Sequence, residues 1–219
     1  MVEIAVTLTL RSPVNIGSGA QQGTLAKRGM LKDRDGWPFI PASALKGRWR
    51  HAAEQIAAAL PDLRVCDTHH DMCRQQPCTV CRLFGSPWQP GRVRFANLPL
   101  TGPETIAALR DNPEHHPKST ARTGVAINRR RRVAQDDFLY DTELFLPGVP
   151  LEFSGAVQGE MSRPQVAFLV AALRLVPALG RSKSAGLGWI NATAVVNDNG
   201  QLLSLDDLAA ALAQEGNHV

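Results

Sequence analysis

The order of the hydrophobic patterns along this chain is the feature that most constrains its fold. Alternating or short β-favouring runs predict strands at residues 3–10, 93–95, 149–157 and 189–196. Apolar residues recur every three or four positions over residues 43–60, and an apolar run covers residues 166–176, so two helices are predicted there. The order strand, helix, strand, strand, helix, strand predicts an α+β fold with a split βαβ, or ferredoxin-like, arrangement. In RNA-recognition modules, such a sheet carries helices on one face and meets its ligand on the other.

Polar residues mark where the helices are expected to begin. Ser43 is expected to cap the first helix. Ser162 and Gln165 form a capping box for the second helix. Ser204 is expected to cap a last short helix over residues 204–215.

Long connections separate these elements. A length of 219 residues suits one large domain or two fused small ones, and we expect one domain, residues 1–219. Its expected parts are an RRM-like palm (residues 1–60, 92–98 and 148–197), a cysteine-containing insertion (61–91), a second insertion (99–147) and the C-terminal helix. Loops of this length are usually functional or disordered.

Charge is distributed unevenly along the chain, whose net charge is +4. Residues 118–134 contain six cations and no acid, and residues 27–50 contain seven cations against Asp33 and Asp35. This asymmetry indicates basic surfaces that face a polyanion, with an ordinary charged surface as the alternative. The first residues begin a strand rather than a secretory signal, and the longest apolar stretch is too short to span a bilayer. We therefore expect a soluble, cytoplasmic protein without a membrane partner.

All four cysteines lie within sixteen positions. They are Cys66, Cys73, Cys78 and Cys81, and the last two form a C-x2-C knuckle. Four thiolates can close a tetrahedral zinc site, and such a site is structural because no ligand position remains open for water. The spacing of the first pair is wide, so His69 or His70 could replace a cysteine as ligand. A disulfide pair and unliganded buried thiols are the alternatives.

Two basic loops are candidates for contacts with phosphate. Residues 181–188 combine Arg181 and Lys183 with two serine hydroxyls and with glycines that let the backbone approach a ligand closely. Residues 129–132 are four consecutive arginines, whose planar and permanently charged groups suit phosphates and stacked bases. A plain glycine turn and a solvated loop are the respective alternatives.

Five segments of the chain resemble motifs of the RAMP superfamily, the repeat-associated proteins of CRISPR effector complexes. Residues 40–50 are similar to its "IPGSSLKGxLR" segment, and residues 15–19 are similar to its "hIGsG" turn. Residues 81–85 resemble its "CxLFG" element, and residues 181–188 resemble its glycine-rich loop. Residues 122–129 are similar to its "hVaIDR" stretch, with asparagine in place of aspartate. The segments occur in the family's order and span most of the chain.

Size and the inserted cysteine loop look most like the type III backbone subunits, the Cas-seven-like branch. The resemblance implies that copies or paralogues stack along a guide (CRISPR) RNA and present it to target RNA, with other subunits of a ribonucleoprotein complex as partners. It also implies that the "hVaIDR" stretch belongs to a thumb hairpin lying across the guide–target duplex. The residues expected to bind RNA are Lys46, Arg48, Arg50, Arg122, Asn128, Arg129, Arg130, Arg131, Arg132, Arg181, Ser182, Lys183 and Ser184. A merely solvated helix face is the alternative for Lys46 and Arg50.

The resemblance also bears on catalysis. Relatives that cleave target RNA carry an aspartate before the "IPGSSLKG" segment, and Lys27 stands at that place here. A lysine does not bind a divalent ion, so we expect a scaffold that binds RNA without cutting it, and Mg²⁺ only if the chain is catalytic. Asp33 and Asp35 lie nearby but are typical of a hairpin turn.

Two other functions stay open at this point. One is a ribonuclease that cuts target RNA with Asp33 or Asp35, or that processes guide precursors with His51 as the base. The other is a zinc-stabilised protein-interaction module that binds no RNA.

Overall fold

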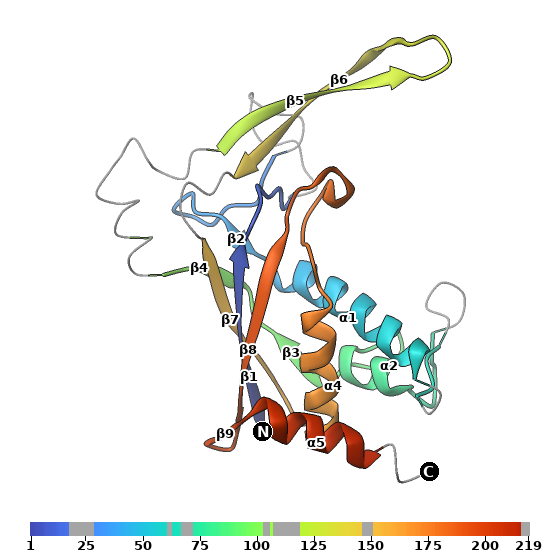
Figure 1. Cartoon of the computed structure of the whole chain (residues 1–219), viewed down its shortest axis with the longest axis vertical. Coiled ribbons are helices and arrows are strands. Elements are labelled where there is room, and N and C mark those ends of the chain that lie inside the picture. Colours follow the sequence, from blue (N-terminus) through green and yellow to red (C-terminus); the bar gives the residue numbers. More distant parts are fainter. Residues whose placement is uncertain are drawn as a thin grey trace.

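A computed structural model describes residues 1–17, 29–60, 63–66, 72–102, 106, 119–145 and 151–215. Its centre is a seven-stranded antiparallel sheet with the order β2-β4-β7-β1-β8-β9, in which β3 also pairs with β7 (Figure 1). The strands of this sheet are β1 (Val2–Leu10), β2 (Phe39–Ile40), β3 (Val93–Phe95), β4 (Leu98–Thr101), β7 (Glu152–Gly159), β8 (Ile190–Asp198) and β9 (Gln201–Leu203). The expected α+β, ferredoxin-like fold is confirmed.

Strand β1 is a central strand of the sheet, because other strands pair along both of its edges. Val6 faces Gly155 of β7 on one side and Ala194 of β8 on the other. Its even-numbered residues are buried, whereas Glu3 and Ala5 are exposed. One face of the sheet therefore carries the core, as the alternating sequence predicts.

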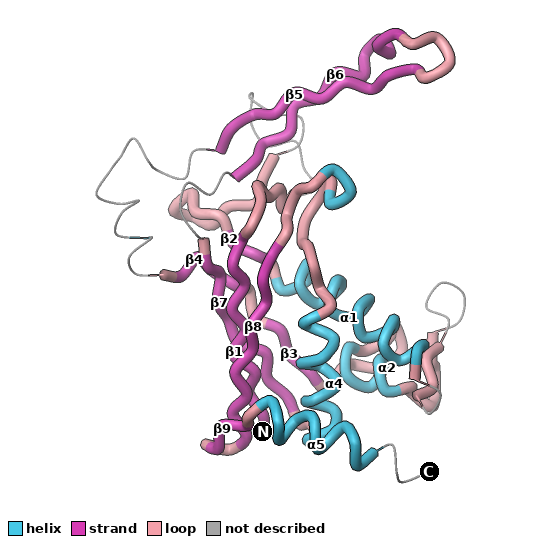
Figure 2. Tube along the Cα trace, in the orientation of Figure 1, coloured by secondary structure: helices cyan, strands magenta, loops and turns pink. Residues whose placement is uncertain are grey.

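Helices cover the buried face of the sheet. They are α1 (Ala42–Ala59), α2 (Thr79–Phe84), α4 (Arg163–Arg174) and α5 (Leu205–Glu215). Helices α1, α2 and α4 lie together on one side of the strands (Figure 2). The fully buried Trp49 of α1 donates its indole N–H to the carbonyl of Leu169 in α4 at 2.8 Å, so the two helices are joined by a directional bond as well as by packing.

Two of the three expected helix caps are confirmed. The side chains of Ser162 and Gln165 form a reciprocal capping box, and the Ser204 hydroxyl accepts the Asp207 N–H at 3.1 Å. The prediction for Ser43 is wrong, because α1 already begins at Ala42, after Pro41. There the side-chain oxygen of Asn97 accepts the Ala42 N–H at 2.8 Å, so a distant residue supplies the partner that a serine would give locally.

A separate two-stranded hairpin projects from one end of the molecule. It consists of β5 (Ser119–Asn128) and β6 (Val133–Phe145) and forms its own antiparallel sheet. Figure 1 shows it extending beyond the end of β1 and β8, with its turn pointing to the side on which the helices lie. Strand β4 continues the main sheet to Thr101, within the range expected for the insertion at 99–147.

The base of the hairpin is joined to the main body by side-chain and backbone contacts. Val14 and Phe145 exchange two backbone hydrogen bonds, of 3.1 and 2.9 Å. The Asn15 side-chain amide donates to the Glu143 carbonyl at 2.6 Å. The Glu143 carboxylate accepts the Met30 N–H at 2.9 Å and pairs with the Lys32 ammonium at 2.6 Å. Glu143 thus connects β6 to two segments that precede α1.

Replacing Glu143 should weaken this joint through the Met30 N–H rather than through the ion pair. Glu143→Ala leaves the N–H of a buried residue without its carboxylate acceptor, which costs about 1–3 kcal/mol. Lys32→Met removes a partly exposed ion pair, whose loss costs at most about 1 kcal/mol. Urea unfolding of the two variants measures both values. Equal destabilisation by both changes would contradict the ranking.

Candidate nucleic-acid interface and metal centre

The four cysteines come together in the structure. The sulfurs of Cys66, Cys73, Cys78 and Cys81 all lie within 4.8 Å of one another. Cys66 Sγ is 3.4 Å from Cys81 Sγ and 3.8 Å from Cys78 Sγ. A Zn–S bond of about 2.3 Å places the sulfurs of a tetrahedral site about 3.8 Å apart, so the cluster fits a zinc ion. All four are free cysteines, and His69 and His70 lie outside the described residues.

The start of α2 forms the knuckle of this cluster. Cys78 is the N-cap of α2, and its sulfur accepts the Cys81 N–H at 3.4 Å. The sulfur of Cys73 accepts the Cys78 N–H at 3.4 Å. Backbone N–H groups directed at sulfur stabilise thiolates, which are the form that binds a metal. The local backbone is therefore already arranged to stabilise negative charge on the sulfurs of Cys73 and Cys78.

The cysteine thiols differ in their tendency to ionise. Burial raises the pKa of the Cys66 thiol to about 12. Burial also opposes ionisation of Cys78, but backbone hydrogen bonds from Cys81 and Cys66 outweigh it and lower the Cys78 pKa. Cys66 consequently keeps its proton at neutral pH in the metal-free chain, and a metal that binds there must displace that proton.

Arg50, one of the residues expected to bind RNA, lies against the cysteine cluster. Its Nε donates to the Glu54 carboxylate at 2.7 Å, and another guanidinium nitrogen donates to the Gly85 carbonyl at 2.6 Å. The third nitrogen is 3.5 Å from the sulfur of Cys81. The guanidinium therefore joins α1 to α2 and supplies positive charge next to the Cys81 sulfur.

The other two α1 cations lie on different flanks of the helix. Lys46 shares the Arg50 flank, and its ammonium is 6.0 Å from the centre of the Phe95 ring. Arg48 lies on the opposite flank because two residues correspond to about 200° around a helix. Its Nε is buried and has no hydrogen-bond partner among the described residues. The three cations of α1 thus do not form one patch.

The glycine-rich loop packs against the turn that follows β1. The Arg181 N–H donates to the Asn15 carbonyl at 2.9 Å, and the Gly188 N–H donates to the Pro13 carbonyl at 2.8 Å. Gly180 and Gly188 both have positive φ, and a Cβ on Gly188 would lie 1.8 Å from the Leu179 carbonyl oxygen. The segments at residues 15–19 and 181–188 resemble two family motifs and lie near opposite ends of the sequence. The hydrogen bond between Arg181 and Asn15 joins them.

The basic residues of this loop face partly outward. Lys183 begins a short 3-10 turn (Lys183–Ala185), and its ammonium donates to the Gly180 carbonyl at 2.9 Å. Ser182 and Ser184 are exposed, as is Arg181, which lies next to Gly17. The loop thus offers exposed hydroxyls and a guanidinium, while the lysine also stabilises the turn.

The arginines form the tip of the hairpin. Residues 129–132 are all exposed, and Arg122 is exposed further down β5. The Asn128 side-chain oxygen accepts the N–H groups of Arg130 and Arg131, each at 3.1 Å. The Arg132 N–H donates to the Asn128 carbonyl at 2.7 Å. Asn128 therefore shapes the tip, a task that an aspartate could also perform.

The catalytic candidates do not form a cluster. The Asp33 carboxylate accepts the N–H groups of Asp35 and Trp37 at 3.0 and 2.8 Å, which confirms the hairpin turn expected there. Asp35 is exposed, and His51 is exposed on α1. Lys27 lies outside the described residues.

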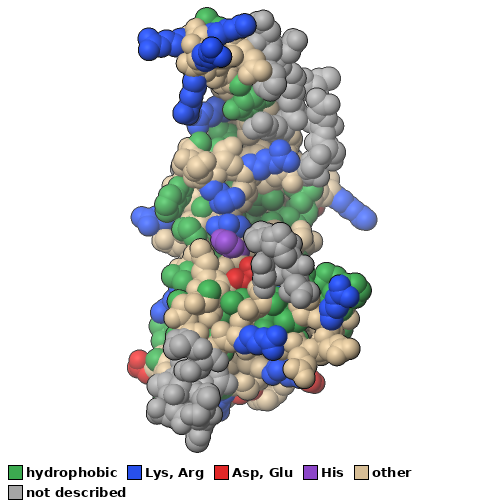
Figure 3. Space-filling model, turned by 90° about the vertical axis from the view of Figure 1, so that its right-hand side faces the viewer, with side chains coloured by type: hydrophobic (Ala, Val, Ile, Leu, Met, Phe, Trp, Pro, Cys, Tyr) green, Lys and Arg blue, Asp and Glu red, His purple; other side chains and the backbone are tan. Residues whose placement is uncertain are grey.

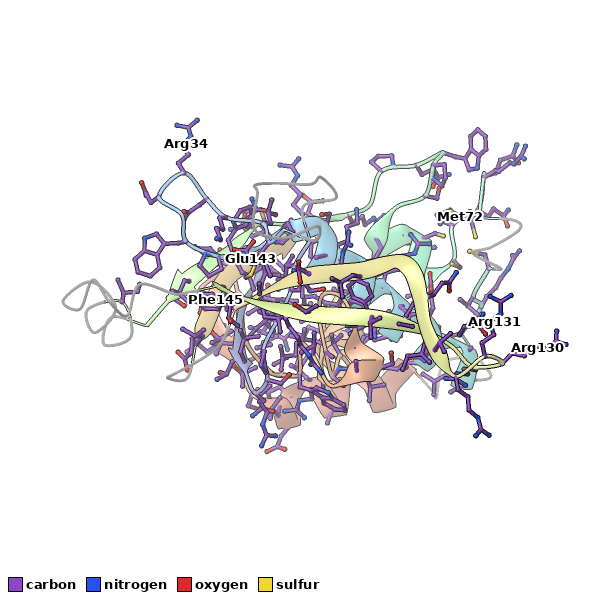
Figure 4. The ribbon with its side chains drawn as sticks, turned by 90° about the horizontal axis from the view of Figure 1, so that it is seen from above. Arg34, Met72, Arg130, Arg131, Glu143 and Phe145 are labelled. Atoms are coloured by element: carbon purple, nitrogen blue, oxygen red, sulfur yellow. The ribbon has the colours of Figure 1, made fainter. Side chains whose placement is uncertain are left out.

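The views of the whole molecule show how the basic segments are arranged. The hairpin and the glycine-rich loop lie at the same end, beyond the start of α1 (Figure 1). On the face shown in Figure 3, Lys and Arg side chains occur from the hairpin downward, whereas the acidic ones lie in the lower half. Seen from above, Arg130 and Arg131 lie on the same side as Met72, and Arg34 lies on the opposite side (Figure 4).

An α+β sheet that carries basic loops at one end is an arrangement typical of nucleic-acid-binding proteins. The RAMP superfamily model matches residues 7–191, so the chain belongs to that family. Membership indicates a CRISPR-associated role in RNA binding. No curated protein matches the sequence. Among the described residues, no helix combines the length and the hydropathy that a membrane span requires.

Removing Arg50 should weaken metal binding without removing a ligand. We expect the native chain to bind one zinc ion and to release protons as it does so. Arg50→Met should lower zinc affinity about 10- to 100-fold, the usual effect of losing an outer-shell partner. Arg82→Met removes the same charge from an exposed position on α2 and should leave the affinity unchanged. Competition with a chromophoric chelator measures both variants, and equal affinities would contradict the role of Arg50.

Proposed function

We propose that this protein is an RNA-binding backbone subunit of a type III CRISPR effector complex. In this role it holds guide RNA and presents it to complementary target RNA, together with other subunits of the complex. The observation that supports this most is the exposed arginine tip of the β5–β6 hairpin, at the same end of the molecule as the glycine-rich loop.

Loops rather than the sheet face are the RNA-binding elements in this proposal. The solvent-facing side of β1, β7 and β8 carries small or polar side chains and the exposed Val195, whereas RNA-recognition sheets stack bases on aromatic rings. The hydroxyl groups of Thr7 and Ser154 hydrogen-bond each other on this face at 3.0 Å, and Thr101 donates to Ser154 at 2.9 Å. These hydroxyls are consequently paired within the protein.

The basic loops suit a ribonucleotide strand electrostatically. Each phosphate that an arginine neutralises releases counterions, which makes the affinity dependent on salt. Residues 118–134 contain no acid that would offset the tip arginines. Guanidinium planes can also stack on bases, so the same four residues can contact either part of RNA. Lys46, Arg48 and Arg122 are further candidates in this proposal, on separate surfaces.

We regard the subunit as non-catalytic. The Asp33 carboxylate is engaged in a local turn, which leaves it less able to bind a divalent ion. In the alternative, an endoribonuclease that needs Mg²⁺, the exposed Asp35 would be the remaining acid of this turn. The cysteine cluster would hold structural zinc, whose binding energy of about 10–16 kcal/mol is enough to order the surrounding segment.

Neutralising the hairpin tip should weaken RNA binding in a salt-dependent way. Replacing all four arginines at 129–132 by alanine should reduce the slope of log affinity against log salt by about 0.7 for each phosphate that is no longer neutralised, or about 3 in total. The paired change Arg34→Ala and Arg174→Ala, at exposed cations on other elements, is the control. Fluorescence anisotropy with single-stranded RNA measures both slopes. An unchanged slope in the tip variant would remove the hairpin from the proposal.

The purified complex should not cut target RNA through this subunit. Asp33→Asn keeps an acceptor for the turn but removes the charge, and Asp35→Asn tests the second candidate carboxylate in the same way. Labelled complementary RNA with Mg²⁺ should give the same product pattern for the native protein and for both variants. Products at regular intervals that disappear in either variant would establish the nuclease alternative instead.

A further inference from the structure

A second basic surface surrounds the cysteine cluster, apart from the hairpin. Residues 72–103 contain no aspartate or glutamate. The surface, called here the cysteine-module surface, consists of Arg64, Arg74, Arg82, Trp88 and Arg92. The backbone N–H of Arg92 donates to the backbone carbonyl of Arg82 at 3.1 Å, so these two residues are neighbours. The positive charge at residues 74–92 thus has no acid within its own segment, whereas Arg64 lies between Asp62 and Asp67 in the sequence.

Trp88 is an exposed aromatic platform at the edge of this surface. Its side chain is 58% exposed, although tryptophan is on average a highly buried residue. The Arg74 guanidinium lies 4.8 Å from the centre of its ring. One face of the indole is therefore covered by a cation, and exposure of this extent leaves room for a second planar group.

The turn that carries Trp88 is fixed to the cysteine loop. The Gln89 side-chain amide donates to the carbonyls of Arg74 and Gln75 at 2.9 and 3.1 Å. The Ser86 hydroxyl donates to the Cys73 carbonyl at 3.1 Å. The platform is therefore positioned by the same loop that supplies metal ligands.

Two clefts lie next to the cysteine cluster, and Arg74, whose guanidinium covers Trp88, lines one of them. One, of about 470 Å³, is lined by Leu63, Arg64, Gln75, Gln76, Pro77, Cys78, Thr79 and Arg82. The other, of about 540 Å³, is lined by Arg64, Cys66, Met72, Cys73, Arg74, Gln75 and Gln76. Arginine and amide groups predominate at the wall of the larger cleft, whereas the smaller one is mixed and includes Leu63 and Pro77. The wall of the larger cleft therefore suits phosphate and base edges better than an apolar helix or strand.

We propose that the cysteine-module surface binds a segment of single-stranded RNA, with a base stacked on Trp88 and phosphates at Arg64, Arg74 and Arg82. Stacking on an indole face together with arginine contacts is the recognition chemistry of single strands. An acidic peptide would use the charges but not the exposed ring, so RNA is the occupant that accounts for both features. The inference rests on the proposed RNA-binding function and adds a site outside the hairpin and the glycine-rich loop.

The position of the surface is consistent with one continuous strand. Met72 lies on the same side of the molecule as Arg130 and Arg131 (Figure 4). Helix α2 and the described residues before it lie beside the C-terminal part of α1, below the level of the hairpin tip (Figure 1). RNA that leaves the tip on this side would extend toward the side on which Met72 lies.

The test is photocrosslinking of the full zinc-loaded chain to single-stranded RNA that contains 5-iodouridine. Trypsin cuts after Arg82 and Arg92, so the peptide of residues 83–92 carries Trp88 as its exposed aromatic residue. We expect a crosslink in this peptide, and we expect it to persist when the four tip arginines are replaced by alanine. Trp88→Ala should remove it and lower affinity roughly 5- to 100-fold, the range for losing one stacked base. Trp88→Phe should restore most of both.

Three outcomes separate this inference from the proposed function. RNA binding that depends on the tip arginines, without a crosslink in residues 83–92, overturns the inference alone. Absence of RNA binding in every form overturns the proposed function as well. Displacement of the RNA crosslink by polyglutamate at equal charge concentration, with no loss in Trp88→Ala, would assign the surface to an acidic protein instead. Unchanged zinc content in the Trp88 variants shows that they remain folded.

Discussion

The contact between Glu143 and the segments before α1 is the joint on which the basic end of the molecule depends. The β5–β6 hairpin forms its own sheet, so its direction is set where β6 meets Val14, Asn15 and Met30. Asn15 also accepts the Arg181 N–H through its carbonyl. One short turn after β1 therefore orients both the hairpin and the glycine-rich loop, and it makes them neighbours although the whole of β7 and α4 separates β6 from that loop in the sequence.

The sequence was sufficient for the main elements because their signals are local. Alternation over β1 and the three- to four-residue repeat of α1 come directly from which side is buried. Strands β2 and β9 and the helix α2 were not predicted, since two to six residues are too few to show a period. Ser43 was mistaken for the cap of α1. The side chain that accepts the Ala42 N–H at the start of this helix belongs to Asn97, which lies 55 residues further along the chain. Long-range partners leave no local pattern.

The chemical type of each candidate residue is visible in the sequence, but the direction in which its side chain points is not. Grouping Cys66, Cys73, Cys78 and Cys81 required only their spacing, and the structure brings all of them together. RNA binding by Arg50 stays a prediction, and its contacts with Gly85 and Cys81 could not be predicted from the sequence. A charge in a basic helix does not reveal which neighbour it meets, because that depends on how another segment folds back. The exposure of Trp88 was missed for the same reason.

Close backbone packing at Gly188 has a consequence for how this protein can change over evolution. The main chain of the glycine-rich loop is locked by contacts with Pro13 and Leu179, and any side chain at position 188 would collide with the latter. The outward residues Ser182 and Ser184 carry no such restriction. Homologous chains can therefore vary the exposed side chains of this loop while its main-chain path stays the same. The ligand preference of the loop can change in this way without a change of fold.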